Sequence, residues 1–224
     1  MTPLTGDLLG RTDHLGLLIT FEGPEGSGKT TLINAIAAHL AEKGEEPMIL
    51  REPGGTDIGE RIRNILLDMA SEGMCSETEL LLMVASRAQL VREKIEIGLE
   101  AGMIILCDRF ADASVAYQGF GRGLGEKQVH ALNKLALGKI EPDLTFLCLL
   151  PPEEGQKRLH SEATDRLDRE SAEFHQRVYE GYQAMAVSGI LRFKVIDATD
   201  TPEEMLKKAL GHLKRLDHGL LKYL

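Results

Sequence analysis

One string constrains the fold of this 224-residue chain more than any other feature: Gly23–Thr30, which reads GPEGSGKT. It matches the pattern G-x-x-x-x-G-K-[ST] in full, follows the apolar run 17–23, and precedes apolar residues at helical spacing from Leu32 to Leu40. Glycines allow successive backbone N–H groups to converge on phosphate oxygens at the positive end of the following helix. The string therefore predicts a phosphate-binding P-loop between a buried strand and a helix.

Side chains in and near this loop predict the handling of a nucleotide phosphate. Lys29 can reach the β and γ phosphates, and the Thr30 hydroxyl can hold Mg²⁺. Asp108 closes the apolar run 103–108, where P-loop enzymes place the carboxylate that assists Mg²⁺, although it can also simply cap the next helix. Arg109 beside it can fork onto a phosphate that Lys29 does not cover.

The rest of the chain alternates between short apolar runs and segments with helical spacing. Such alternation indicates an α/β fold, with a parallel sheet covered on both faces and ligands at the carboxyl edge of its strands. Besides 17–23, we expect strands at 47–51, 103–108, 143–150 and 191–197, and helices at about 58–66, 77–100, 111–138 with a glycine-rich break at 119–125, from 152, at 170–188 and from 202.

Length, charge and cysteine usage limit the classes of protein. The length suits one domain at 15–224, after an extension at 1–14 that we expect to be disordered. A net charge of -9 argues against a duplex nucleic acid partner. The first 14 residues do not resemble a signal peptide, and no run is long enough to span a membrane. The scattered cysteines Cys75, Cys107 and Cys148 favour reduced thiols in a cytoplasmic protein over a disulfide or metal framework.

Several further strings, taken together and in this order, resemble the thymidylate kinase family. They are FEGPEGSGKTT at 21–31, REPGGT at 51–56, ASRAQLV at 85–91, DRFADASVAYQGFGRG at 108–123 and DRLD at 165–168. The resemblance implies a P-loop NTPase fold, a three-layer α/β/α arrangement with a five-stranded parallel sheet. It also implies a homodimer that uses Mg²⁺ and transfers the γ-phosphoryl of ATP to thymidine monophosphate (dTMP), giving dTDP and ADP.

The same resemblance implies roles for individual residues. Glu25 would receive the 3′-hydroxyl of the deoxyribose, Arg109 would bind the acceptor phosphate, and Arg87 would donate to the O4 edge of thymine. The rest of the acceptor site would be formed by Pro53 in the wall, Ser114 near the polar edge of the base, Tyr117 against the sugar 2′ position and Gln118 over the base. The ATP phosphates would contact Gly23, Pro24, Glu25, Gly26, Ser27, Gly28, Lys29 and Thr30.

The P-loop carries Gly26 after Glu25 and no arginine, as in the subtype of the family whose mobile lid supplies basic residues. We expect this lid near residues 158–170. Arg166 in DRLD is the first candidate for the lid arginine, with Arg158 and Arg169 as alternatives, and we expect Arg166→Ala to lower the transfer rate by ~10²-fold or more. The catalytic groups would then be Lys29, Asp108, Arg109 and Arg166.

One position departs from the family pattern. Where the family usually stacks a phenylalanine on thymine, four residues before Arg87, this chain has Met83. Aromatic stacking on a base contributes ~1–3 kcal/mol and a thioether contact with a ring ~0.3–1.5 kcal/mol. We therefore expect Met83 to weaken dTMP binding without changing the substrate, unless it is simply a core residue of its helix.

Two alternatives remain open from the sequence. One is a kinase for another nucleoside monophosphate, and the other is a nucleotide-binding switch or regulatory module without kinase activity. A GTP switch is the weaker hypothesis, because the nearest string to N-K-x-D, at 133–136, lacks the aspartate. A switch also has no use for Arg87, the YQG string at 117–119 and an arginine-bearing lid together.

Overall fold

Five parallel strands form one sheet in the order β2–β3–β1–β4–β5. The computed structural model of the chain describes residues 15–158, 165–216 and 218–221, so the expected extension at 1–14 and part of the expected lid lie outside the described residues. The strands are β1 (Leu17–Glu22), β2 (Met48–Arg51), β3 (Ile104–Asp108), β4 (Leu144–Leu149) and β5 (Phe193–Asp197). The predicted five-stranded parallel sheet is confirmed, and each strand end lies at the expected bound or at most two residues inside it.

Helices connect the strands. In the described part of the chain these are α1 (Lys29–Glu42), α2 (Asp57–Leu67), α3 (Ser76–Leu90), α4 (Glu96–Glu100), α5 (Ala111–Ser114), α6 (Glu126–Leu137), α7 (Pro152–Arg158), α8 (Ala172–Ala186) and α9 (Pro202–Leu213). Short 3₁₀ turns lie at η1 (Met69–Ser71) and η4 (Gly219–Leu221), and π-helical turns at η2 (Val91–Ile95) and η3 (Val115–Gly121). The single helix expected over 77–100 is thus α3 and α4 joined by η2, and the expected break at 119–125 begins only after η3.

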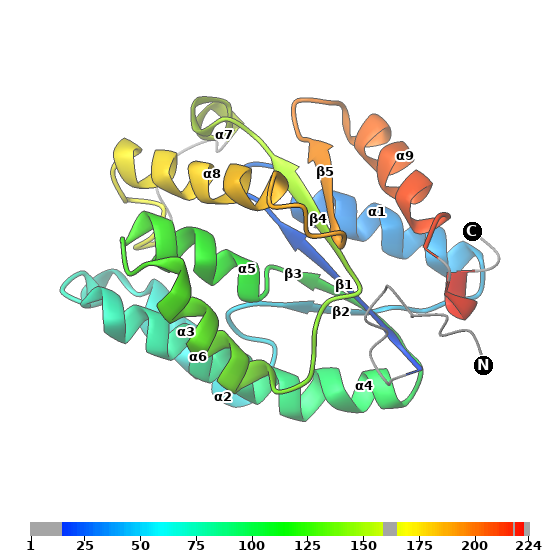
Figure 1. Cartoon of the computed structure of the whole chain (residues 1–224), viewed down its shortest axis with the longest axis horizontal. Helices are drawn as coiled ribbons and strands as arrows, with labels where there is room; N and C mark the ends of the chain where they lie inside the picture. Colours follow the sequence, from blue (N-terminus) through cyan, green and yellow to red (C-terminus); the bar gives the residue numbers. More distant parts are fainter. Residues whose placement is uncertain (1–14, 159–164, 217, 222–224) are drawn as a thin grey trace, which may run out of the picture.

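The sheet is the middle of three layers (Figure 1). On β1, Leu17, Ile19 and Phe21 point to one face and pack with buried residues of α1 and α9, whereas Leu18 packs on the opposite face with Leu99 of α4. This alternation follows from the two-residue period of a strand, and burial on both faces explains the continuous apolar run. Each fully buried leucine, isoleucine or phenylalanine contributes about 1.5–3 kcal/mol to stability. The α/β/α arrangement is therefore confirmed.

Strand register brings distant functional segments to one edge of the sheet. Asp108 at the end of β3 lies opposite Phe21 on β1 and Arg51 on β2, and Glu22 on β1 lies opposite Leu147 on β4. All strands are parallel, so their carboxyl ends share this edge. The P-loop leaves β1 here, next to the segments that follow β2 and β3.

Among the described residues, no helix combines the length and the apolar character that a membrane crossing requires.

Candidate active site

The P-loop takes its shape from glycines with positive φ angles, two of which leave no room for a side chain. Gly23 has φ +146°, and a Cβ there would lie 2.2 Å from the carbonyl oxygen of Cys148 in β4. Gly26 has φ +71°, and its Cβ would lie 2.8 Å from the carbonyl oxygen of Gly155 in α7. Gly28, at φ +76°, immediately precedes α1. The loop therefore fits between β4 and α7 only without side chains at positions 23 and 26, and it ends at the N-terminus of a helix, as predicted.

Lys29 is buried inside the loop that it follows. Its Nζ donates to the carbonyl oxygens of Pro24 and Gly23, at 2.8 Å and 3.1 Å, and to Ser27 Oγ at 3.2 Å. Burial lowers the pKa of Lys29, and the nearby Arg109 lowers it further. The loop atoms thus hold the ammonium group beside the backbone amides where phosphate is expected to bind.

The Thr30 hydroxyl and the Asp108 carboxylate meet at the floor of the site. Thr30 Oγ1 donates to Asp108 Oδ2 at 2.8 Å, although the two residues lie on different strand–helix units. Two oxygen ligands side by side next to a phosphate loop match the preference of Mg²⁺. The donor set therefore fits the metal that the sequence predicts.

Arg109 ties the P-loop to the opposite wall. Its Nη1 donates to Gly23 O at 2.9 Å and to Tyr182 Oη at 3.2 Å, and its Nη2 to Glu25 Oε1 at 2.6 Å and to Tyr117 Oη at 3.0 Å. Its backbone lies in the left-handed region, at φ +65°, which costs of order 1–3 kcal/mol for a residue with a side chain. Such a conformation is found mainly at functional sites, where the surroundings hold it.

The pKa of Glu25 reflects this ion pair. Burial alone would raise the pKa, but Arg109 and Lys29 outweigh it and lower the pKa of Glu25 to about 2. Glu25 is therefore ionised at neutral pH and balances the two cations. Its carboxylate, which also accepts from Tyr117 at 3.2 Å, is only partly buried.

Arg87 is almost completely buried, with 1% of its surface exposed, and each of its three side-chain nitrogens donates a hydrogen bond. Nε donates to Glu52 Oε2 at 2.8 Å, Nη1 to Asn133 Oδ1 at 2.6 Å, and Nη2 to Phe110 O at 3.0 Å and Ser114 Oγ at 3.1 Å. Burial raises the pKa of Glu52 despite the neighbouring Arg87. Arg87 is thus held rigidly in the wall that the sequence assigns to the acceptor base.

A cavity of about 470 Å³ joins these groups. It contains every residue expected at the acceptor site: Glu25, Pro53, Met83, Arg87, Arg109, Ser114, Tyr117 and Gln118. Six of the residues expected to bind ATP or to act in catalysis also line it: Gly26, Ser27, Gly28, Lys29, Thr30 and Asp108. Gly23 and Pro24 do not line the cavity; their carbonyl oxygens accept from Lys29 instead.

The three candidates for the lid arginine, Arg166, Arg158 and Arg169, lie in different surroundings. The Arg166 guanidinium is outside the cavity lining, where it donates to Glu79 Oε2 at 2.6 Å and to Leu66 O at 3.0 Å. Arg158 at the end of α7 does line the cavity, with Nη1 3.5 Å from Gly26 O. Residues 159–164 of the expected lid lie outside the described residues, and Arg169 is exposed.

Sequence reasoning missed two features of the site. Arg63 of α2 lines the cavity and donates to Pro53 O at 3.0 Å, but an arginine on an amphipathic helix usually reads as a solvated charge. A second hollow of about 340 Å³ shares Gly26, Gly28, Thr31 and Arg158 with the main cavity and is closed by Asp200, Pro202 and Met205. No pattern in the sequence marks this hollow, because it depends on how the segment after β5 packs beside the P-loop.

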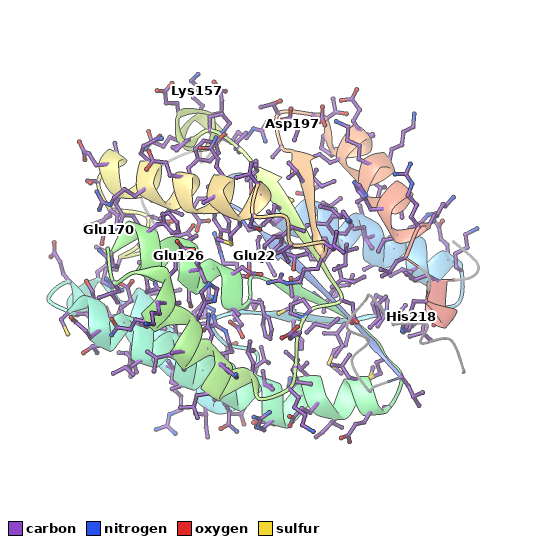
Figure 2. The ribbon with its side chains drawn as sticks, viewed as in Figure 1. Glu22, Glu126, Lys157, Glu170, Asp197 and His218 are labelled. Carbon is purple, nitrogen blue, oxygen red and sulfur yellow. The ribbon has the colours of Figure 1, made fainter. Side chains whose placement is uncertain are left out.

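Glu22, at the end of β1, lies in the interior behind the site (Figure 2). Its Oε1 accepts from the backbone N–H groups of Phe110 and Ala113, at 2.7 Å and 3.2 Å, and Tyr182 Oη donates to Oε2 at 3.0 Å. Burial raises the pKa of Glu22 to about 8, with a further rise from Asp112. Glu22 therefore holds the start of α5 and the tyrosine that contacts Arg109.

A phosphate loop that opens into an arginine-lined cavity on a parallel sheet places the chain among the P-loop phosphotransferases. A family model described as Thymidylate kinase matches residues 21–209, and the chain belongs to the thymidylate kinase family. The resemblance read from the sequence is thereby confirmed, and with it the class of enzyme, a kinase.

Individual relatives cover nearly the whole chain. A protein of Desulfovibrio desulfuricans named Thymidylate kinase is 43% identical over 216 residues, which is 91% of this chain and 100% of the relative. Relatives with the same name from Bacillus licheniformis and Lactobacillus delbrueckii subsp. bulgaricus are 44% and 46% identical, over 86% and 84% of this chain and 92% and 91% of their own lengths.

Proposed function

We propose that this chain transfers the γ-phosphoryl of ATP to dTMP, giving dTDP and ADP. The observation that carries the proposal is the 470 Å³ cavity, in which the P-loop faces all the residues expected at the acceptor site. The names of the relatives in the family point to the same acceptor.

The donor half uses the P-loop. The backbone amides of Gly26–Thr30 and the Lys29 ammonium would bind the β and γ phosphates, and Arg158 would approach them from α7. The second hollow, beyond Gly28 and beside Asp200, offers room for the rest of the donor nucleotide. We assign Arg158 to the donor phosphates because it lines both cavities, whereas the Arg166 side chain is engaged elsewhere.

The acceptor half begins at Arg109. Its guanidinium lies between the P-loop and Tyr117, so an acceptor phosphate bound there would face the γ phosphate across the cavity. Arg87 and Ser114 would meet the polar edge of the base, and Met83 with Pro53 would cover its apolar surface.

Catalysis in this arrangement depends on position and charge. Phosphoryl transfer needs little covalent help from a protein, but the negative charge on the equatorial oxygens must be stabilised as the reacting oxygens come into line. Among the cations that line the cavity, Lys29 and Arg158 would act on the donor phosphates and Arg109 on the acceptor phosphate. Fixed cations in a cavity from which water is displaced stabilise the transition state by several kcal/mol.

We propose Mg²⁺ as the metal, held by Thr30 Oγ1 and Asp108 Oδ2, directly or through water. When bound there, the ion would supply positive charge that offsets part of the negative charge of the donor phosphates. A cytoplasmic location stays a prediction.

We also propose a homodimer. Exposed apolar side chains on the paired helices α2 and α3, namely Ile58, Ile65 and Leu81, support an association surface there. Light scattering of the wild-type chain and of Leu81→Asp would test it: a wild-type chain that is monomeric at micromolar concentration contradicts the proposal.

A switch or regulatory module without kinase activity is not favoured. Such a module would need only the P-loop half of the cavity, whereas the buried Arg87, held by Glu52 and Asn133, lines the other half. A kinase for a different nucleoside monophosphate differs only in the base pocket, so it is tested together with the proposal.

The test is an assay of ADP formation with dTMP, dUMP, dCMP, dAMP and dGMP as acceptors. We expect dTMP to be the best acceptor and dUMP a slower one, because one methyl group is worth only about 1–3 kcal/mol. A higher kcat/KM with a purine nucleotide or dCMP would replace dTMP as the substrate. ADP formation that no acceptor stimulates would favour the switch.

A further inference from the structure

Glu79, in the first turn of α3, is a buried carboxylate to which the mechanism assigns no role. It has no exposed surface and accepts four hydrogen bonds. Gln118 Nε2 donates to Oε1 at 2.8 Å, Arg122 donates through Nε at 3.1 Å and Nη2 at 2.8 Å, and Arg166 Nη2 donates to Oε2 at 2.6 Å. Three segments far apart in the sequence therefore meet at one side chain.

The contact with Gln118 determines which way its amide points. Burial would raise the pKa of Glu79, but Arg122, Gln118 and Arg166 outweigh it and lower the pKa, so the carboxylate is ionised at neutral pH. An ionised carboxylate only accepts hydrogen bonds, so Gln118 must turn its nitrogen towards Glu79. Because Gln118 also lines the main cavity, this orientation turns its carbonyl oxygen away from Glu79, where it can accept from a ligand.

A fixed carbonyl oxygen selects among pyrimidines. The N3 atom of thymine and uracil carries a hydrogen and can donate to it, whereas N3 of cytosine is an acceptor and would be left facing another acceptor. A buried polar group that loses its partner in this way costs much more than a lost apolar contact. The orientation that Glu79 imposes on the Gln118 amide therefore disfavours the binding of cytosine.

The contact with Arg166 anchors a second part of the cavity. The Arg166 backbone N–H donates to Leu67 O at 3.2 Å and its side chain reaches Glu79, while its neighbours Asp165 and Leu167 line the cavity. The same carboxylate thus holds one wall of the cavity and orients a side chain in the other.

We propose that Glu79 is a positioning residue that fixes the Gln118 amide for recognition of the acceptor base and anchors residues 165–167 as a wall of the same cavity. This inference rests on the proposed function for its substrate, and on the hydrogen bonds of Glu79 for its geometry.

Glu170 supplies a matched control. It pairs with the same Arg122, at 2.6 Å, but it is partly exposed and lies at the outer edge of the molecule before α8 (Figure 2). Glu170→Gln removes a carboxylate from this arginine and leaves Glu79 with its contacts to Gln118 and Arg166.

The experiment measures kcat and KM for dTMP in Glu79→Gln, Glu79→Asp, Glu170→Gln and the wild type. Calorimetry gives the dissociation constants of dTMP and dCMP for the same proteins, and their ratio is the preference. A neutral amide at position 79 can accept or donate, so the Gln118 amide is free to turn. We expect Glu79→Gln to reduce the preference for dTMP over dCMP at least about tenfold, the effect of one hydrogen bond on an equilibrium constant, with KM changing more than kcat. We expect Glu170→Gln to stay within about twofold of the wild type.

An unchanged preference and KM in a folded Glu79→Gln protein would overturn the proposal, since a merely structural role lowers the melting temperature without changing base selection. If Glu79→Gln does not fold, Glu79→Asp provides the test. Aspartate keeps the negative charge but is too short to keep all four contacts. We therefore expect the same fall in the preference for dTMP over dCMP, and an unchanged preference would overturn the proposal.

Failure of the proposed function is recognised separately. If the wild type does not phosphorylate dTMP, the substrate assignment falls, and hydrogen exchange without substrate still tests the anchor. The amides of Arg166, Leu167 and Asp168 are hydrogen-bonded in the protein. We expect their exchange to be at least about tenfold faster in Glu79→Asp than in the wild type, and equal rates would refute the anchor.

Discussion

At the scale of single residues, the site consists of cations that already have partners. Arg109 is held by Glu25 and two tyrosines, Arg87 by Glu52 and the carbonyl oxygen of Phe110, and Lys29 by its own loop. Holding a guanidinium in place before the substrate arrives reduces the ordering that binding requires. In Arg109 this arrangement goes with a left-handed backbone conformation, which is energetically unfavourable for a residue with a side chain.

Lys29→Met removes the ammonium group from the donor half while keeping most of the apolar stem. We expect kcat to fall by ~10²–10³-fold, the usual effect of removing one electrostatic contact to the transition state, with a smaller change in the KM of dTMP. Steady-state kinetics checks this, with Lys43→Met at the exposed end of the same helix as the control. A fall of less than about threefold would contradict the role of Lys29.

Met83→Phe tests the base pocket. Met83 lines the cavity, so a ring there can stack on the base in place of a thioether. We expect dTMP to bind several-fold more tightly, since the difference between the two contacts is on the order of 1 kcal/mol. Calorimetric titration with dTMP measures it. Weaker binding would mean that the cavity is shaped around methionine.

At the scale of elements, the connections after the strands carry the function. The π-helical turn η3 places Tyr117 and Gln118 in the cavity wall, and such turns are frequent at functional sites. The end of α7 and the segment that follows it show a division between two arginines close in sequence. Arg158, the last residue of α7, borders the P-loop, whereas Arg166 is bound to Glu79 on α3.

This division predicts different effects for two arginine variants. We expect Arg158→Ala to lower kcat by ~10²-fold with little change in melting temperature, because an exposed cation near the donor phosphates is lost. We expect Arg166→Ala to lower the free energy of unfolding by about 3 kcal/mol, because it breaks a buried ion pair. Kinetics and thermal unfolding separate the two. If Arg166→Ala lowers kcat more than Arg158→Ala does, Arg166 takes part in the transfer step and this assignment is wrong.

At the scale of the whole molecule, a buried carboxyl group at the centre links stability to pH. Glu22 is enclosed by the end of β1, the start of α5 and Tyr182 of α8. Its pKa is about 8 in the folded protein, against an ordinary value of 4.5. Between these values the folded protein keeps a proton on Glu22 that the unfolded chain has lost, so the contribution of Glu22 to stability falls as the pH rises.

Glu22→Gln removes this titration and keeps a neutral side chain of the same size. Relative to the wild type, we expect the free energy of unfolding of the variant to rise by roughly 2–4 kcal/mol between pH 5 and pH 8. Urea unfolding across this range measures the difference, and the exposed Glu126 on α6 gives a control substitution (Figure 2). A difference that does not change with pH would show that Glu22 does not titrate there.

The sequence by itself determined the local elements and the chemistry of each string. The P-loop, the alternation of strands and helices and the acidic end of β3 all follow from short-range patterns, since glycine geometry and side-chain period act within a few residues. The strings quoted for the family resemblance also contain all the residues expected at the acceptor site except Met83, and these residues line the cavity.

Only the tertiary structure decided which partner each charged side chain has. Arg166 is bound to Glu79, 87 residues away, and Arg87 to Asn133, 46 residues away, and such pairings depend on how helices pack rather than on spacing in the chain. The same holds for Arg63, which reaches the cavity only because α2 packs beside the segment after β2. The energy of a charge depends on its burial and on its neighbours in space, and both are set by the packed molecule.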